Sequence, residues 1–170
     1  MSRSIFAYLA IVAAAIAVAV ISFNASLLYL HQFPRTYSWS DMMINYQGGF
    51  IRRGLLGEIA LHVNSVIPAK RFFYLFIVGS YVVVLAGIIR MAPSAGLLAG
   101  LMFILSPAGL LFSVNDPVAF GRKDIVIMAA FTLAWFTAKR LTAARAVLLT
   151  IAIYLVAALI IESAIVFFPA

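Results

Sequence analysis

Long runs of apolar residues, separated by short polar stretches, account for most of this 170-residue chain. A helix needs about 20 apolar residues to cross the hydrocarbon core of a membrane. The apolar pattern predicts five such helices, at about residues 5–30, 72–89, 91–113, 117–138 and 146–168. The expected fold is therefore all-α, a polytopic transmembrane helical bundle that forms a single integral membrane domain over residues 1–170.

Residues 31–71 form the one long segment that apolar residues do not dominate. This first loop holds two of the five acidic residues, five of the twelve basic residues and both histidines. In its first part, Ser40 and Asp41 can form the N-cap of a short helix, which the glycines at 48 and 49 would end. Residues 50–63 then predict an amphipathic helix that lies in the membrane interface. The apolar stripe of this second helix consists of Ile51, Leu55, Ile59 and Val63.

The start of the fourth span decides where several charges lie. A helix over 125–138 would have about 14 residues and a length of about 21 Å, too short to cross. Asp116 is a good N-cap residue and Pro117 suits the first helical position, so we expect the helix to begin at Pro117. This start places Arg122, Lys123 and Asp124 inside the helix, roughly 10 Å from its beginning.

Glu162 lies in the fifth span, which is antiparallel to the fourth. We expect its carboxylate about 9 Å from the membrane surface that carries the first loop, at the depth of Arg122, Lys123 and Asp124. Ionisable groups at that depth face a polar cavity or a partner rather than lipid. The alternative is that Glu162 pairs with Arg122 or Lys123 and only fixes helix packing. Asp116 is interpreted as a helix cap.

The composition excludes a soluble domain, because 66% of the residues are hydrophobic and 10% are charged, whereas soluble proteins carry about 25% charged residues. The net charge of +7 comes from basic residues that flank apolar runs. This placement favours anionic lipid or a phosphate-bearing lipid substrate over nucleic acid. The absence of cysteine excludes disulfides, thiolate metal sites and cysteine nucleophiles.

Basic residues also predict the orientation. The raw count of charges favours an external N-terminus, but short loops near span ends carry the most weight, and the loop over 139–145 holds three basic residues. We therefore expect a cytoplasmic N-terminus, an uncleaved first helix and an external first loop. The expected location is a multi-pass protein of the bacterial inner membrane.

In plan, the chain resembles membrane glycosyltransferases of the GT-C type. These have a cytoplasmic N-terminus, a large first external loop with two interfacial helices, and an acidic catalytic residue early in that loop. Asp41 matches that residue, and Asp116 or Asp124 matches a second acidic residue between spans three and four. The segments GGFIRRGLLGE and GRKD are similar to those of uncharacterised bacterial membrane proteins. Members usually have more than five spans, which favours an N-terminal fragment of a longer protein.

The resemblance implies transfer of a sugar from a polyprenyl-phosphate carrier at the external leaflet. Asp41 would act as general base on the acceptor hydroxyl. The phosphate leaving group would be held by cations, a task suited to arginine and lysine. Asp124 or Glu162 would orient those cations or bind a divalent ion. The cations that the resemblance implies are Arg52, Arg53, Arg122 and Lys123.

Two other functions fit the same pattern. A transporter or flippase would also need a cavity lined by charges, although the spans show no obvious repeat. A non-enzymatic assembly subunit would use the interfacial helix as a partner surface, and there Arg52 and Arg53 would contact lipid headgroups.

Overall fold

The computed structural model describes residues 3–32, 37–49, 54–95, 98, 101, 102, 104 and 122–161. Every regular element within these residues is an α-helix, in agreement with the predicted fold class. The helices are α1 (Arg3–Gln32), α2 (Tyr37–Met42), α3 (Leu55–Val63), α4 (Ala69–Ala95), α7 (Asp124–Ala138) and α8 (Ala143–Ile160).

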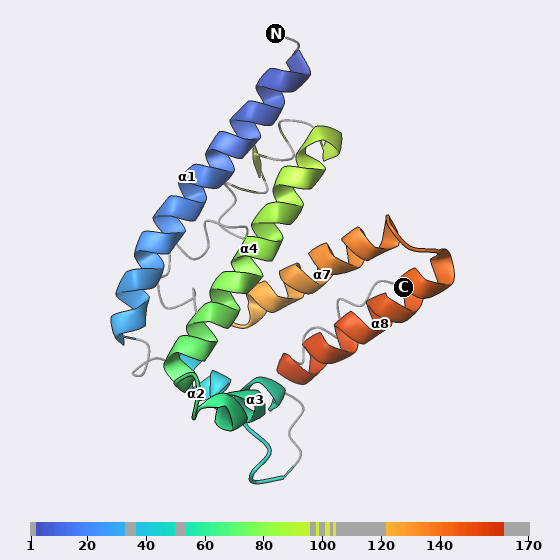
Figure 1. The fold of residues 1–170 in the computed structure, drawn as a ribbon. Helices are drawn as coiled ribbons and strands as arrows, with labels where there is room; N and C mark the ends of the chain where they lie inside the picture. The colour runs from blue at the N-terminus through green and yellow to red at the C-terminus, as the bar shows by residue number, and fades with distance from the viewer. Residues whose placement is uncertain are drawn as a thin grey trace.

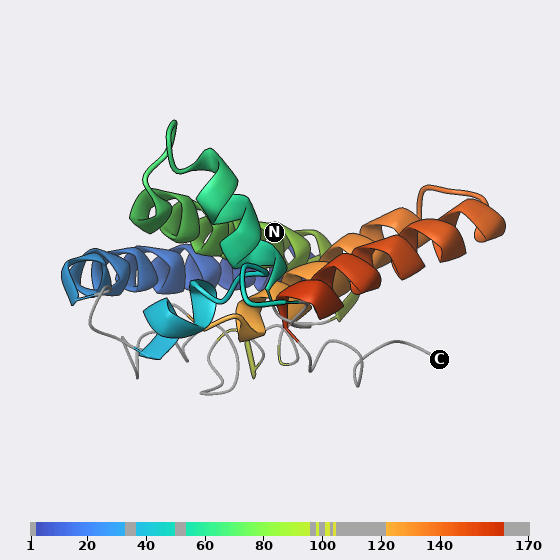
Figure 2. The ribbon, with the colours of Figure 1, turned by 90° about the horizontal axis from the view of Figure 1, so that it is seen from below.

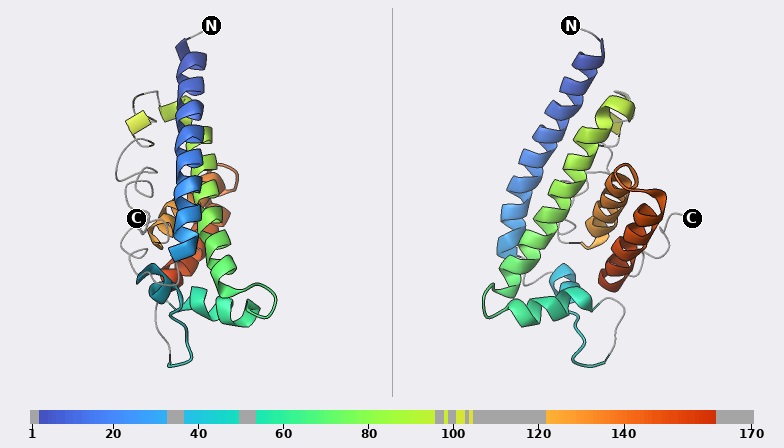
Figure 3. Two further views of the ribbon diagram at one scale, coloured as in Figure 1. Left: turned by 90° about the vertical axis from the view of Figure 1, so that its left-hand side faces the viewer. Right: turned by 45° about the vertical axis from the view of Figure 1, so that its right-hand side comes forward.

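The long helices form a bundle whose far end is closed by the two short ones (Figure 1). α1 and α4 run side by side in opposite directions, α7 packs on α4, and α8 returns along α7. α2 and α3 lie across the end of the bundle away from the N-terminus (Figure 3). Viewed from that end, the α7–α8 hairpin projects to one side of the α1–α4 pair (Figure 2).

One face of α4 explains why the bundle closes. Its buried residues recur at alternating spacings of four and three, which places them on a single helical stripe. The stripe consists of Phe73, Ile77, Ser80, Val84 and Gly87. A Cβ atom at Gly87 would collide with the Cγ2 atom of Thr132 on α7, so the absent side chain allows the two helices to cross closely.

The outside of the bundle is apolar as well. Phe6 on α1, Leu75 on α4 and Leu148 on α8 are 65%, 58% and 69% exposed. Two described segments, Ala69–Met91 and Ala143–Ile160, are long and apolar enough to cross a membrane. Of the most apolar 18 residues of each segment, only 28% and 22% are buried inside the protein. The core helix of a soluble domain would be mostly buried. Exposed apolar surface of this extent marks contact with a membrane or another protein.

The described helices do not supply the five predicted spans. The predicted turn between 72–89 and 91–113 is wrong, because α4 continues through Arg90 to Ala95. Arg90 extends from the side of this helix, with its guanidinium carbon 5.9 Å from the ring centre of Phe136 on α7. A charged residue that finds such a partner gives no reason for the backbone to turn.

The predicted helix over 117–138 also begins later than expected. α7 has 15 residues, and Arg122 precedes it while Lys123 is its N-cap residue. Its length of about 22 Å is short of the hydrocarbon thickness. Arg122 and Lys123 are therefore not inside the helix as predicted. Pro117 and Asp116 lie outside the described residues.

The last predicted span, 146–168, is too long at its end. α8 stops at Ile160, and Ile161 has extended backbone angles, φ −146° and ψ 125°. Glu162 lies outside the described residues, and the helix that was expected to carry it has ended before it. The expected depth of its carboxylate in the membrane therefore stays a prediction.

The predicted amphipathic helix exists as α3, but it packs through a different face. Its buried residues are Leu56, Gly57 and Ala60. Ile59 of the predicted apolar stripe is 40% exposed. The small residues face inward because α3 lies very close to the chain that precedes it. Leu55 and Val63 of the same stripe are partly buried, and Leu55 packs against the edge of the core.

Candidate functional site

An ion pair joins the first loop to the beginning of α7. The ammonium nitrogen of Lys123 lies 3.3 Å from the Oδ2 atom of Asp41. The same ammonium donates a hydrogen bond of 2.8 Å to the backbone carbonyl of Asp41. The Lys123 side chain is 2% exposed and that of Asp41 is 18% exposed. The carboxylate thus stands between a buried cation and the protein surface.

α2 positions the carboxylate. This short helix is fixed by Met42, which is fully buried, and by Trp39, whose ring meets the Phe73 ring of α4 edge-on at 5.6 Å. Asp41 lies in its last turn, not at the start of a following helix, so the interpretation of Asp41 as an N-cap is wrong. Carbonyl groups at a helix end lack intrahelical partners, and a cation there is favourable. Lys123 supplies that cation.

α7 turns Lys123 inward. Positions 123, 127, 130 and 134 follow the three- and four-residue spacing of one helical face, and all four residues are buried. An ammonium on such a face must be paired, because an uncompensated buried charge is very costly. The small alanines at 130 and 134 continue this face, and their spacing is the sequence feature that indicates which of the three adjacent charged residues points inward.

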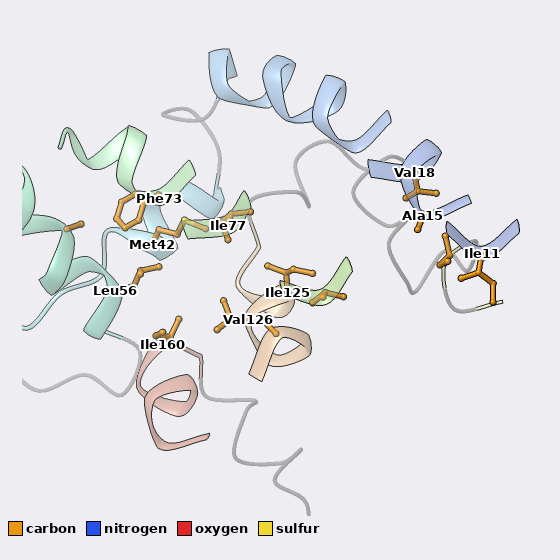
Figure 4. Close-up of a cluster of buried hydrophobic side chains, with 14 residues drawn as sticks. Ile11, Ala15, Val18, Met42, Leu56, Phe73, Ile77, Ile125, Val126 and Ile160 are labelled. Carbon is orange, nitrogen blue, oxygen red and sulfur yellow. The ribbon is translucent and has the colours of Figure 1, made fainter. Parts of the chain in front are cut away.

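Apolar side chains from five helices meet at the end of the bundle where this pair joins α2 to α7 (Figure 4). They belong to one buried cluster, which α2, α3, α4, α7 and α8 all enter at this end of the bundle. Its labelled members around this point are Met42, Leu56, Phe73, Ile77, Ile125, Val126 and Ile160. These apolar side chains offer the buried Lys123 ammonium no counter-charge, whereas Asp41 supplies one.

Arg122 and Asp124, on either side of Lys123, point the other way. Their Nε and Oδ2 atoms are also 3.3 Å apart, but the side chains are 57% and 55% exposed. The three consecutive charged residues therefore divide into one buried cation and one exposed ion pair. Both pairs lie at the end of the bundle that carries α2 and α3, on the side where the sequence placed them.

The loop after Asp41 is anchored on α3. The backbone N–H of Tyr46 donates a 3.0 Å hydrogen bond to the Oε2 atom of Glu58. A Cβ atom at Gly57 would collide with the carbonyl oxygen of Ile44, so only glycine permits this approach. Gly49, with φ of +114°, lies in a turn that favours glycine, but the helix that it was expected to end stops earlier, at Met42. The sequence pattern does not indicate this anchoring role of Glu58.

Arg52, Arg53 and Glu162 lie outside the described residues. Among the residues that the structure describes, no group of three or more His, Cys, Asp or Glu side chains could hold a metal ion. Lys123 pairs with Asp41, and its expected pairing with Glu162 stays a prediction.

The arrangement gives the two partners different chemical capacities. Asp41 keeps part of its carboxylate at the surface, where a hydroxyl group could approach within hydrogen-bond distance. Lys123 is enclosed, so its ammonium can orient Asp41 but does not face an external ligand. Arg122 is the described cation of the predicted set that is open to a phosphate group.

Comparison of the chain with known protein families, curated proteins and solved structures finds no match.

Proposed function

We propose that this chain is a multi-pass protein of the bacterial inner membrane with a glycosyltransferase site at its external end. The membrane part is supported by the apolar exterior and by the two segments long enough to cross. The helices that carry these two segments are α4 and α8, and the other predicted spans belong to the proposal. The N-terminus is cytoplasmic in this proposal, which makes the end with α2 and α3 external.

The observation that carries the enzymatic part is the partly exposed Asp41 carboxylate held by a buried Lys123 ammonium. In the proposed reaction, Asp41 accepts the proton of the acceptor hydroxyl. That oxygen forms the new bond to the anomeric carbon, while the bond from this carbon to the phosphate oxygen breaks and polyprenyl phosphate leaves. Arg122, together with Arg52 and Arg53, neutralises the leaving phosphate, and Asp124 orients Arg122.

A non-enzymatic assembly subunit is the second candidate. It is favoured by the burial of Lys123 and by its bond to the Asp41 carbonyl, because a pair of this kind can serve packing alone. In that case Asp41 and Lys123 could be replaced together by neutral residues without loss of function. In the enzymatic case they could not.

The two candidates are separated by Asp41→Asn/Lys123→Met, which removes both charges at once. The protein is reconstituted in vesicles and supplied with a panel of polyprenyl-phosphate sugars and a soluble sugar acceptor. Release of polyprenyl phosphate is measured by mass spectrometry. Loss of a general base is worth about 10²–10⁴ in rate, so we expect release by the unmodified chain and at least about a hundredfold less by the double variant.

The outcomes are distinct. Equal release by the double variant and the unmodified chain would exclude Asp41 as the base. No release by the unmodified chain with any donor of the panel would refute the glycosyltransferase proposal. A double variant that keeps its association with the partner proteins copurified with the unmodified chain would then support the assembly subunit.

A further inference from the structure

The turn between α7 and α8, at the end of the bundle away from Asp41, carries a concentrated positive charge. Lys139, Arg140 and Arg145 fall within seven consecutive residues, and all three are exposed. Arg90 reaches the same end from α4, as its contact with Phe136 shows. These four residues are called the basic turn surface below.

Aromatic rings support this surface. The ammonium nitrogen of Lys139 lies 4.2 Å from the ring centre of Trp135, and Arg90 lies over Phe136. The two rings are themselves in contact, with centres 5.2 Å apart. Cations that rest on aromatic faces keep their charge while their stems remain on apolar surface. Tryptophan beside lysine and arginine is typical of the boundary between a membrane and water.

Among the residues that the structure describes, this surface has no acidic counterpart. Of the described acidic residues, Asp41, Glu58 and Asp124 all lie at the opposite end of the bundle. Asp124 begins α7 and is separated from Lys139 by the whole helix, about 22 Å. Every ion pair resolved within the described part of the chain also lies at that opposite end. Within the described residues, therefore, no carboxylate neutralises the basic turn surface, and its exposed cations are open to an anion from outside the chain.

The flanks of the surface indicate where that anion comes from. Val147 and Leu148, in the first turns of α8, are 57% and 69% exposed, and Leu133 of α7 is 41% exposed. Exposed apolar side chains next to exposed cations match one lipid leaflet, because the apolar side chains can contact the acyl chains and the cations can contact the headgroups. A soluble anion would neutralise the charges but would leave these apolar side chains in water.

We propose that the basic turn surface, Arg90, Lys139, Arg140 and Arg145 with Trp135 beside them, binds the headgroups of anionic phospholipids in the leaflet opposite the Asp41–Lys123 site. This proposal rests on the membrane embedding put forward above and is independent of glycosyl transfer. It assigns the basic residues at this end a binding role in addition to their effect on orientation.

The chain has two tryptophans, Trp39 and Trp135, which permits a direct optical test. Trp39→Phe keeps a ring against Phe73 and leaves Trp135 as the sole reporter of the basic turn surface. The protein is reconstituted in phosphatidylcholine vesicles with a minor fraction of lipid brominated in the acyl chain near the headgroup. This lipid is either phosphatidylglycerol or phosphatidylcholine, and quenching of Trp135 measures how often each contacts the surface.

We expect brominated phosphatidylglycerol to be preferred about fivefold, the equivalent of one effective headgroup contact of about 1 kcal/mol. Arg140→Gln/Arg145→Gln should reduce the preference toward unity, and high salt should weaken it. The matched control is Lys70→Gln/Arg71→Gln, which removes two charges at the other end of α4 and should leave the preference unchanged.

Two results would overturn the proposal. The first is equal quenching by the two brominated lipids in the Trp39→Phe protein. The second is a preference that falls equally in the Lys70/Arg71 variant, which would indicate attraction by net charge rather than a local surface. Flotation with the vesicles is measured in parallel, and a chain that fails to float would contradict membrane embedding itself, a failure distinct from loss of lipid preference.

Discussion

Two ion pairs of equal length but unequal burial permit a test of how the Asp41–Lys123 pair contributes to stability. Asp41→Asn removes the carboxylate that lies 3.3 Å from the Lys123 ammonium, whose side chain is 2% exposed. At 3.3 Å and an effective dielectric constant of about 20, the Coulomb attraction that is lost amounts to about 5 kcal/mol. Part of this was offset by desolvation of both groups, so we expect a net loss of about 3 kcal/mol.

In a domain of this size, a loss of about 3 kcal/mol lowers the midpoint of thermal unfolding by about 6–12 °C. The assay is thermal unfolding of the detergent-solubilised protein, followed by circular dichroism. Arg122→Gln is the matched control, because Arg122 and Asp124 are also 3.3 Å apart but more than half exposed. This substitution should cost less than about 1 kcal/mol.

The double variant Asp41→Asn/Lys123→Met tests whether the loss comes from an unpaired charge on Lys123. With no buried charge left, it should recover about 2 kcal/mol of the loss, the rest being the unpaired carbonyl of Asp41. If Asp41→Asn costs no more than Arg122→Gln, or if the double variant is less stable than Asp41→Asn, then the ammonium is not neutralised by Asp41 and the reasoning is refuted.

Two further predictions concern the loop that follows Asp41. Gly57→Ala should cost about 1–3 kcal/mol, because its Cβ would meet the carbonyl oxygen of Ile44, whereas Gly79→Ala, which meets nothing within 4 Å, should be neutral or stabilising in thermal unfolding. Glu58→Ala should cost about 1 kcal/mol and speed hydrogen exchange at the amide of Tyr46, which loses its 3.0 Å bond to the carboxylate; unchanged exchange would contradict this anchor.

The helical class and the grouping of charges could be predicted from the sequence because both depend on composition over long stretches. The apolar runs require helices, and the polar first loop must lie at one end of them. Placement of Asp41 and Lys123 at the same end followed from counting residues. Their direct pairing could not be predicted, since 82 positions separate them and no local pattern encodes such a contact.

The ends of the helices were the least predictable part. Arg90 was expected to end a span, but α4 continues past it because the guanidinium finds an aromatic ring on α7. Proline at position 117 suggested an early start for α7, whereas Lys123 is held outside the helix by its contact with α2. In each case a tertiary contact set the end of the helix, at a different residue from the one that local propensity suggested.

The prediction of which face of α3 is buried was wrong for a related reason. Leu55, Ile59 and Val63 form the most apolar stripe, but Gly57 and Ala60 face the protein because close approach of the backbone requires small side chains. Hydrophobicity alone therefore does not identify the side of this helix that packs most closely on the protein. Side-chain size is the better criterion there.

The central claim is that the end with Asp41 and Lys123 and the end with the basic turn surface lie on opposite sides of a membrane. The chain contains no cysteine, so single cysteines at exposed Gln47 and exposed Thr142 can each be labelled with a membrane-impermeant maleimide in intact cells. The account predicts labelling at position 47 from outside and labelling at position 142 only after the membrane is opened. Labelling of both positions from the same side would contradict it.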